Sequence, residues 1–184
     1  MNKKALNEMT LQELWELFPI VLTKHQDCWS GWYKEEVNQL KDILPHSAKY
    51  YHIGSTAIKD IWAKPIIDIL IVVNNGDELK NTADTLQQNG YIIMSSTAKR
   101  ISLNKGYTQE GFAQKVFHLH LRLDGDIDEI YFKDFLNDHP DVAKQYEELK
   151  LQLWKTYEHD RDAYTQAKSE FVNKYTQLAK QTLI

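Results

Sequence analysis

Asp68 is the residue of this sequence whose setting most clearly suggests chemistry. It is the one polar side chain in the segment from Ile66 to Val73, whose other residues are all apolar. Such a segment predicts a β-strand that is covered on both faces. A carboxylate there loses its hydration, so it needs hydrogen-bond donors, a cation or a metal ion. We therefore interpret Asp68 as a functional carboxylate, and the alternative is an Asp that caps a neighbouring loop.

The Gly-Ser-Thr segment Gly54–Thr56 is a second candidate, directly after a predicted strand over residues 49–53. A Gly-Ser turn can point backbone N–H groups at an anion, and the hydroxyl groups add donors. Lys64 then leads into the strand of Asp68. The spacing allows one loop and one strand, so the donors and the carboxylate can converge at one edge of the sheet. A plain turn is the alternative interpretation.

Two histidines and an arginine share one face of a predicted strand over residues 115–123. Strict alternation places His118, His120 and Arg122 on the face opposite a row of apolar residues. Two imidazoles two positions apart on a strand can reach one metal ion or one phosphate, and the guanidinium extends the same row. The alternative is the solvent-exposed face of an antiparallel sheet.

Lys168 is the fourth candidate because it interrupts the apolar stripe of the last predicted helix. It follows Tyr164 by four residues and precedes Phe171 by three, so the three side chains share one face. A lysine in that place either extends its amine to solvent or directs it at an anion beneath the helix.

The elements that position these residues alternate between helix and strand and then become helical. A helix is predicted from Thr10 to Phe18, with Glu13 completing a capping box. We expect the aromatic residues at helical spacing to lie in the core, namely Trp15, Trp32, Tyr146 and Trp154. Strands are predicted over residues 20–23, 49–53, 66–73, 91–94, 99–103 and 115–123, and further helices over 31–44, 77–89, 128–138, 141–157 and 160–181.

This order of elements predicts an α/β (α+β) fold. We expect a mixed β-sheet that is covered on one or both faces, with a C-terminal helical bundle packed on it. All 184 residues are predicted to form one domain, with the α/β core over about residues 10–125 and the C-terminal helices over 126–184.

The composition argues against several classes of protein. Lys and Arg total 22 and Asp and Glu total 26, a net charge of −4, so we expect neither extended nucleic acid nor a membrane surface as a partner. No apolar run approaches the ~20 residues of a transmembrane helix. The lone Cys28 excludes a disulfide framework and a cysteine zinc site. The first residues lack an apolar stretch, so we expect no signal peptide and a cytoplasmic location.

The sequence resembles the GrpB family of bacterial proteins, which belongs to the nucleotidyltransferase superfamily with its polymerase-β-like fold. The resemblance extends from about Glu16 to Tyr175. Its most specific part is the Gly-Ser turn followed by the Lys-Pro-Ile-Ile-Asp block. The matching stretches are His52–Ile58, Ala63–Ile69, His118–His120, Phe132–Leu136, His139 with Pro140, and Tyr164 with Lys168, Phe171 and Val172.

The resemblance implies the fold and a phosphate-binding turn more strongly than it implies catalysis. In the superfamily, two carboxylates on one strand face, usually with a third on a later strand, hold two Mg²⁺ ions for attack on an α-phosphate. Asp68 matches the first acidic position, but Leu70 stands at the second. Because these two residues share a face of the strand, Leu70 removes a metal ligand at this place.

The resemblance thus leads to the hypothesis of a nucleotidyltransferase-like protein that binds a nucleotide or a related phosphate ligand. As an enzyme it would transfer a nucleoside monophosphate to a small acceptor, with Mg²⁺ or Mn²⁺ as cofactor. The residues assigned to phosphate or nucleotide binding are Gly54, Ser55, Thr56, Lys64, Arg122 and Lys168. Those assigned both to catalysis and to metal binding are Asp68, His118 and His120.

Two alternatives belong to other classes of protein. The first is a non-catalytic nucleotide- or coenzyme-binding module of the same fold, which has lost the chemistry together with the second carboxylate. Some family members are fused to a dephospho-CoA kinase, which implies a nucleotide or coenzyme context. The second alternative is a metal-dependent hydrolase, with one metal ion held by the histidine strand and Asp68.

Overall fold

A computed structural model describes residues 4–182 of the chain. Its five strands form one sheet in the order β1-β2-β5-β4-β3, in which β2 and β5 are parallel and the other neighbours are antiparallel. This arrangement confirms the predicted mixed sheet. The strands are β1 (Lys49–Ile53), β2 (Ile66–Val73), β3 (Ile92–Ser96), β4 (Arg100–Thr108) and β5 (Gly111–Leu123).

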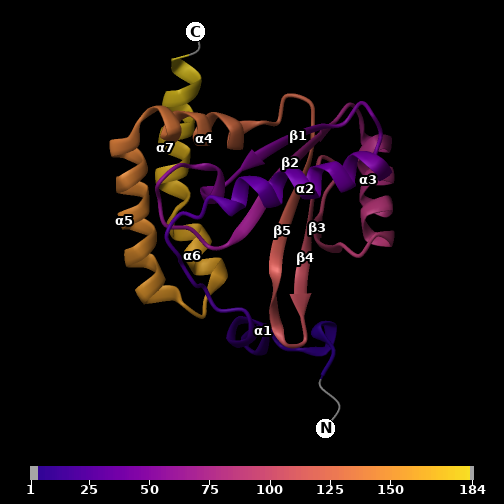
Figure 1. The fold of residues 1–184 in the computed structure, drawn as a ribbon, viewed down its shortest axis with the longest axis horizontal. Coiled ribbons are helices and arrows are strands. Elements are labelled where there is room, and N and C mark those ends of the chain that lie inside the picture. Colours follow the sequence, from indigo (N-terminus) through magenta and orange to yellow (C-terminus); the bar gives the residue numbers. More distant parts are fainter. Residues whose placement is uncertain (1–3, 183–184) are drawn as a thin grey trace.

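Helices precede, interrupt and follow the strands. Two short 3₁₀ helices, η1 (Leu6–Glu8) and η2 (Ser55–Ala57), lie before α1 and after β1. Figure 1 shows the helices from α4 to α7 gathered at one side of the sheet, while α2 lies across the strands. The α-helices are α1 (Leu11–Leu17), α2 (Cys28–Ile43), α3 (Gly76–Gln88), α4 (Asp128–Asp138), α5 (Pro140–Tyr157), α6 (Arg161–Ala167) and α7 (Ser169–Gln181).

Strand β2 is covered on both faces, as its apolar sequence predicts. The residues Ile67, Ile69 and Ile71 point into the main core together with α2 and α3. On the opposite face, Leu70 and Val72 pack against Ile127 and Ile130 at the start of α4. The face of β2 that carries Asp68 is therefore apolar toward the end of the strand. Asp68 itself lies near the start of the strand, where this face lines a cavity.

The loop between β1 and β2 is fixed on the C-terminal helices. Ile58 and Ile61 are buried against α4, α5 and α7. The Trp62 N–H donates to Glu147 Oε2 at 2.6 Å, and the Asn137 side chain donates to the Ala57 carbonyl at 3.0 Å. These contacts hold both ends of the loop, so the turn at Gly54 and the approach to β2 have defined positions.

Several local expectations need correction. Residues 20–23 form no strand; only an isolated bridge joins Thr23 to Ala63. Strands β4 and β5 extend far beyond the predicted 99–103 and 115–123, because they continue into a hairpin that closes between Thr108 and Gly111. The predicted helix over 160–181 breaks at Lys168, whose N–H bonds to the Thr165 carbonyl three residues earlier.

The aromatic residues predicted for the core divide into two groups. Tyr146 is buried, whereas Trp15, Trp32 and Trp154 are only partly buried. The capping box of Thr10 and Glu13 is confirmed, but α1 itself has no buried residue. None of the helices within residues 4–182 is long and apolar enough to cross a bilayer. The expectation about a signal peptide falls partly on residues 1–3, which lie outside the described residues.

Candidate functional site

The turn after β1 brings the backbone against the carboxylate of Asp68. Ile53 pairs with Asp68 across β1 and β2, and Gly54 then takes φ +68° and ψ −173°. Only glycine adopts this conformation readily. A Cβ atom at Gly54 would lie 2.9 Å from Asp68 Cγ and closer still to Oδ2. Glycine is therefore required here both by the backbone angles and by the approach of the carboxylate.

Thr56 supports the turn from behind. Its hydroxyl donates to the Ile66 carbonyl at 3.3 Å and lies 3.0 Å from His52 Nε2. Burial lowers the pKa of His52 to about 4, so the ring is neutral at pH 7 and its Nε2–H can donate to Thr56. The His52 ring also stacks on Tyr33. The Thr56 hydroxyl proton is thus already used, and Thr56 is not the free phosphate donor that the sequence suggested.

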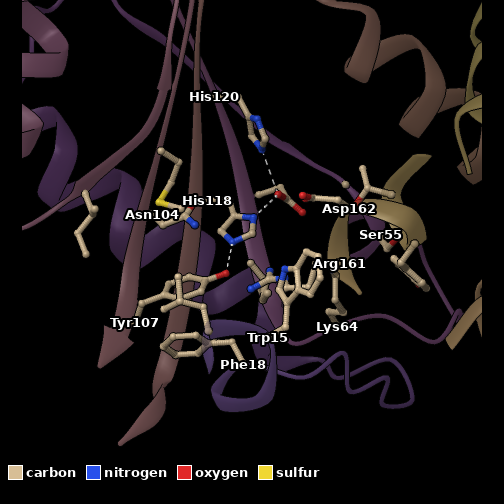
Figure 2. Close-up of a pocket in the computed structure, with 18 of the residues that line it drawn as sticks. Trp15, Phe18, Ser55, Lys64, Asn104, Tyr107, His118, His120, Arg161 and Asp162 are labelled. Atoms are coloured by element: carbon tan, nitrogen blue, oxygen red, sulfur yellow. Dashed lines mark hydrogen bonds and ion pairs between the residues drawn. The ribbon is translucent and has the colours of Figure 1, made fainter. Parts of the chain in front are cut away.

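Asp68, His118 and His120 come together as the sequence predicted. Asp68 pairs with His118 across the parallel strands β2 and β5, and Leu70 pairs with His120. Asp68 Oδ1 lies 3.1 Å from His120 Nε2 and 3.5 Å from His118 Nδ1 (Figure 2). Burial raises the pKa of Asp68, but the hydrogen bonds of His118 and His120 to the carboxylate outweigh it and hold that pKa well below its usual value. Asp68 is consequently ionised.

The second nitrogen of His118 is also occupied. The Tyr107 hydroxyl lies 2.8 Å from His118 Nε2, and Figure 2 shows this pair beside the carboxylate contact. Burial lowers the pKa of His118, which favours a neutral ring that donates from Nδ1 and accepts at Nε2. Tyr107 lies in β4 beyond the predicted strand over residues 99–103, so its contact with His118 was not predicted.

The donor set does not fit the pair of divalent metal ions that the resemblance implies. One Asp68 oxygen faces both imidazoles, and the other faces Gly54. The position of the second carboxylate is filled by Leu70, which is fully buried among apolar side chains. Within residues 4–182, no group of three His, Cys, Asp or Glu side chains is arranged to hold a metal ion. The arrangement instead forms a hydrogen-bonded carboxylate that is closed by two imidazoles.

Cationic side chains from three further elements converge near this carboxylate. Lys64 precedes β2, Lys150 lies in α5, and Arg161 and Lys168 lie at the start and end of α6. The amines of Lys64 and Lys168 stand 5.4 Å and 4.4 Å from the centre of the Tyr164 ring. Lys150 donates to the Trp62 carbonyl and is 2% exposed.

Burial of these amines sets their pKa values near neutrality. Burial, and then the charges of Lys168 and Arg161, lower the pKa of Lys64 to about 7. Burial, and then the charge of Lys168, lower the pKa of Lys150 to about 7 as well. Burial lowers the pKa of Lys168 to about 8 against the opposing charge of Asp68. Each amine would gain from an added anion, because the anion would offset both desolvation and mutual repulsion.

Arg122 does not join the other predicted residues. It is buried, but its guanidinium turns toward the start of α4, where it donates to Glu129 at 3.4 Å and approaches Asp126 at 3.8 Å. It does not line the cavity that holds Asp68. The alternation correctly placed Arg122 on the face of the histidines, but Val72, its neighbour on β2, lies under α4, which covers this end of the sheet.

One cavity of about 910 Å³ joins the turn, the carboxylate and the cations. Figure 2 shows Ser55 and Lys64 on one side and Tyr107 and Phe18 on the other. Lys150 stands between Leu149 and Leu151, which is a weak signal of its burial, whereas no sequence pattern ties Arg161 to the site. The polar residues that line the cavity are Asn7, Gly54, Ser55, Thr56, Lys64, Asp68, Asn104, Tyr107, His118, His120, Tyr146, Lys150, Arg161, Asp162, Tyr164, Thr165 and Lys168.

This sheet, with a Gly-Ser turn after β1 and a carboxylate on β2, defines a nucleotidyltransferase-like fold. The structure of the Cid1 poly(U) polymerase with bound MgGTP matches with a TM-score of 0.50 at 13% identity, over 80% of this chain and 47% of that one. The complex of Cid1 with its short product ApU matches with a TM-score of 0.51 at 12% identity, over 80% and 45%. Likeness at these identities shows the fold alone.

The chain belongs to the GrpB protein family, whose profile matches residues 19–178. The glutamate-rich protein GrpB of Alkalihalophilus pseudofirmus is 35% identical over 84% of this chain and 92% of its own length. The UPF0157 protein YqkA of Bacillus subtilis is 29% identical over 92% of this chain, which spans only 51% of YqkA. The crystal structure of the conserved protein GrpB from Enterococcus faecalis matches with a TM-score of 0.77 at 28% identity, over 89% of this chain and 99% of that one.

Proposed function

We propose that this protein binds a nucleotide or a related organic phosphate in the cavity between the Gly54 turn and the lysines. The observation that carries the proposal is an excess of cations. Four cationic side chains line the cavity, namely Lys64, Lys150, Arg161 and Lys168, against the two carboxylates of Asp68 and Asp162. In the part of the chain that the structure describes, none of the four cations forms an ion pair.

The three buried lysine amines are costly to keep charged without a counter-ion. Desolvation lowers the pKa of Lys64, Lys150 and Lys168, so each charged amine is held against its preference for water. A phosphate with two or more charges would supply the missing counter-charge, and amines bind phosphate strongly when desolvated. The N–H groups of the turn and the Ser55 hydroxyl lie along the same cavity and add neutral donors.

The size of the cavity supports a ligand larger than inorganic phosphate. A volume of about 910 Å³ lies within the range of sites for drug-sized ligands and cofactors. The Tyr107 ring packs on Phe18 at 4.7 Å, and the Arg161 guanidinium lies 5.5 Å from the Tyr107 ring centre. Aromatic faces and a guanidinium plane can stack on a planar base.

Transfer of a nucleoside monophosphate is the second candidate function. It is favoured by the position of Asp68, which stands beside the turn with two imidazoles that could hold or accept a proton. Binding without transfer is favoured by Leu70, because the second metal-binding carboxylate of the superfamily is replaced by an apolar residue in an apolar cluster.

Thermal unfolding with a panel of nucleotides tests the proposal. A ligand at ~100 times its dissociation constant should stabilise the protein by about 2.7 kcal/mol. We expect stabilisation by at least one nucleotide in the wild type and little in Lys168→Gln, while the exposed variant Lys174→Gln behaves as the wild type. The absence of stabilisation by every nucleotide and by pyrophosphate would reject the proposal.

Metal ions separate binding from transfer in the same panel. Stabilisation that is equal in EDTA and in Mg²⁺ or Mn²⁺ indicates a binding module. Stabilisation that requires the metal ion and is lost in Asp68→Asn indicates a metal-dependent site, which release of pyrophosphate from a nucleoside triphosphate would extend to transfer.

A further inference from the structure

The cavity continues beyond its cationic end onto a part of the sheet that no helix of the C-terminal bundle covers. Asp68, His118, Asn104 and Ile92 are register neighbours on β2, β5, β4 and β3, so their side chains point to the same face. All four line the cavity. Three strand spacings separate the first from the last, a distance of about 14 Å.

The far end of this row is apolar and open. Leu11, Ile92 and Met94 line the cavity and are 55%, 45% and 59% exposed. They are three of only seven large apolar residues that are exposed within residues 4–182. Exposed apolar side chains that gather at one place on a protein surface mark a binding site.

The N-terminal segment provides the second wall of this apolar end. Leu6, Leu14, Trp15 and Phe18 line the cavity together with Leu11, and all precede residue 19, where the match to the family profile begins. Trp15 therefore contacts the cavity and not the core. Helix α1, which has no buried residue, contributes an apolar surface that faces the ligand space.

We infer that the ligand is an amphiphilic organic phosphate, with its phosphate at the lysines beside Asp68 and an apolar group between α1 and β3, where Ile92 lies about 14 Å across the strands from Asp68. This inference rests on the proposed phosphate-binding function. Inorganic phosphate or a small sugar phosphate would leave the apolar end empty. The phosphate of a lipid within a bilayer would not reach Lys64 and Lys168, because these amines lie inward beside Tyr164, whose side chain is buried. The ligand is therefore a dissolved molecule.

A series of n-alkyl phosphates tests this inference by calorimetry on the full chain. The probes are inorganic phosphate, butyl phosphate and octyl phosphate. The alkyl phosphates are used below the concentrations at which they form micelles. Burial of one methylene contributes about 0.8 kcal/mol, or roughly fourfold in affinity. Because the far group of the octyl chain stays partly exposed, we expect octyl phosphate to bind at least about tenfold more tightly than butyl phosphate.

Two variants assign this gain to the apolar end. Ile92→Ser with Met94→Ser changes exposed positions, so it should fold normally and lose most of the gain of octyl over butyl phosphate. Val21→Ser is the matched control, since Val21 is exposed but does not line the cavity, and it should keep the tenfold gain. Lys168→Gln should weaken binding of both alkyl phosphates.

The other possible outcomes distinguish failure of this inference from failure of the proposed phosphate-binding function. If phosphates and nucleotides bind but chain length has no effect, the inference fails and the proposed function stands. The inference also fails if the gain survives in the double variant. Binding to phosphatidic acid vesicles without binding of dissolved octyl phosphate would assign the apolar end to a membrane and refute the inference. If neither nucleotides nor any phosphate bind, the proposed function itself fails.

Discussion

Replacement of Gly54 by alanine tests the geometry of the site at its tightest point. The new Cβ would lie 2.9 Å from Asp68 Cγ, so the carboxylate would have to move away from the turn. Movement of the carboxylate would break its contacts with His118 and His120. The residue at this position also holds φ at +68°, which an alanine adopts only with strain.

The expected cost has two parts. Backbone strain of this kind costs on the order of 1–3 kcal/mol. Loss of hydrogen bonds to a charged carboxylate adds about 1.5–3 kcal/mol. Gly90→Ala is the matched control, because Gly90 has φ +87° but nothing within 4 Å of the added Cβ. We therefore expect Gly54→Ala to lose about 2.5–6 kcal/mol of unfolding free energy, and Gly90→Ala to lose only about 1–3 kcal/mol through strain.

Urea unfolding at pH 7 measures both variants, and nucleotide titration follows on the folded protein. In a domain of this size, 1 kcal/mol corresponds to roughly 2–4 °C in Tm, so thermal melts also resolve the difference. Gly54→Ala should lose the stabilisation by ligand that Gly90→Ala retains. Equal unfolding free energies and equal ligand responses in the two variants would refute the close approach of Asp68 to the turn.

Three further predictions follow from the charges around the site. Burial lowers the pKa of Lys64 and Lys150 to about 7 and that of Lys168 to about 8. Raising the pH from 6.5 to 9 should therefore neutralise these amines and weaken pyrophosphate binding at least about tenfold, as measured by calorimetry. An affinity that stays constant over this pH range would contradict a role of the lysines in binding. His52 has a folded-state pKa of about 4, lowered by burial, so the unfolded chain binds its proton first as the pH falls from about 6.5. Wild-type stability to urea should therefore fall between pH 7 and pH 5 by about 2 kcal/mol more than that of His52→Gln, and equal losses would contradict a neutral buried His52. Arg122→Met should lower the unfolding free energy by about 1.5–3 kcal/mol through loss of its contacts with Glu129 and Asp126, yet leave nucleotide affinity within about twofold of wild type; a large loss of affinity would return Arg122 to the site.

Much of the sheet was predictable because the pattern of apolar and polar residues in its strands indicates which side chains are buried. The apolar segment around Asp68 and the alternation around His118 each fix a strand and its faces, and β1 and β2 have the predicted bounds. The hairpin of β4 and β5 was underestimated because its outer half mixes glycine, polar and aromatic residues without a strict alternation. It is held by pairing between strands, which no local pattern records.

The candidate site was predictable only where its residues lie on these strands. Gly54, Asp68, His118 and His120 follow from strand order and the turn. Lys150 comes from α5, which packs on Ile58 and Ile61. Arg161 comes from α6, whose Tyr164 packs with Ile20 and Leu22. Long-range packing of that kind leaves little trace in a single sequence.

Helix α4 explains why Arg122 was misassigned. Alternation reports which face a side chain occupies, and Arg122 does share the face of His118 and His120. It does not report which other element covers that face. The guanidinium of Arg122 already forms ion pairs with the carboxylates of Asp126 and Glu129. The arginine therefore contributes to the packing of α4 on the sheet.

The proposed phosphate site lies between the Gly54 turn and the lysines. A crystal structure of the full chain with a non-hydrolysable nucleoside triphosphate, in the presence of Mn²⁺, examines this place most directly. We expect phosphate density within hydrogen-bond distance of the Ser55 backbone and of the Lys64 and Lys168 amines. Phosphate density outside this cavity, with these amines unliganded, would contradict it.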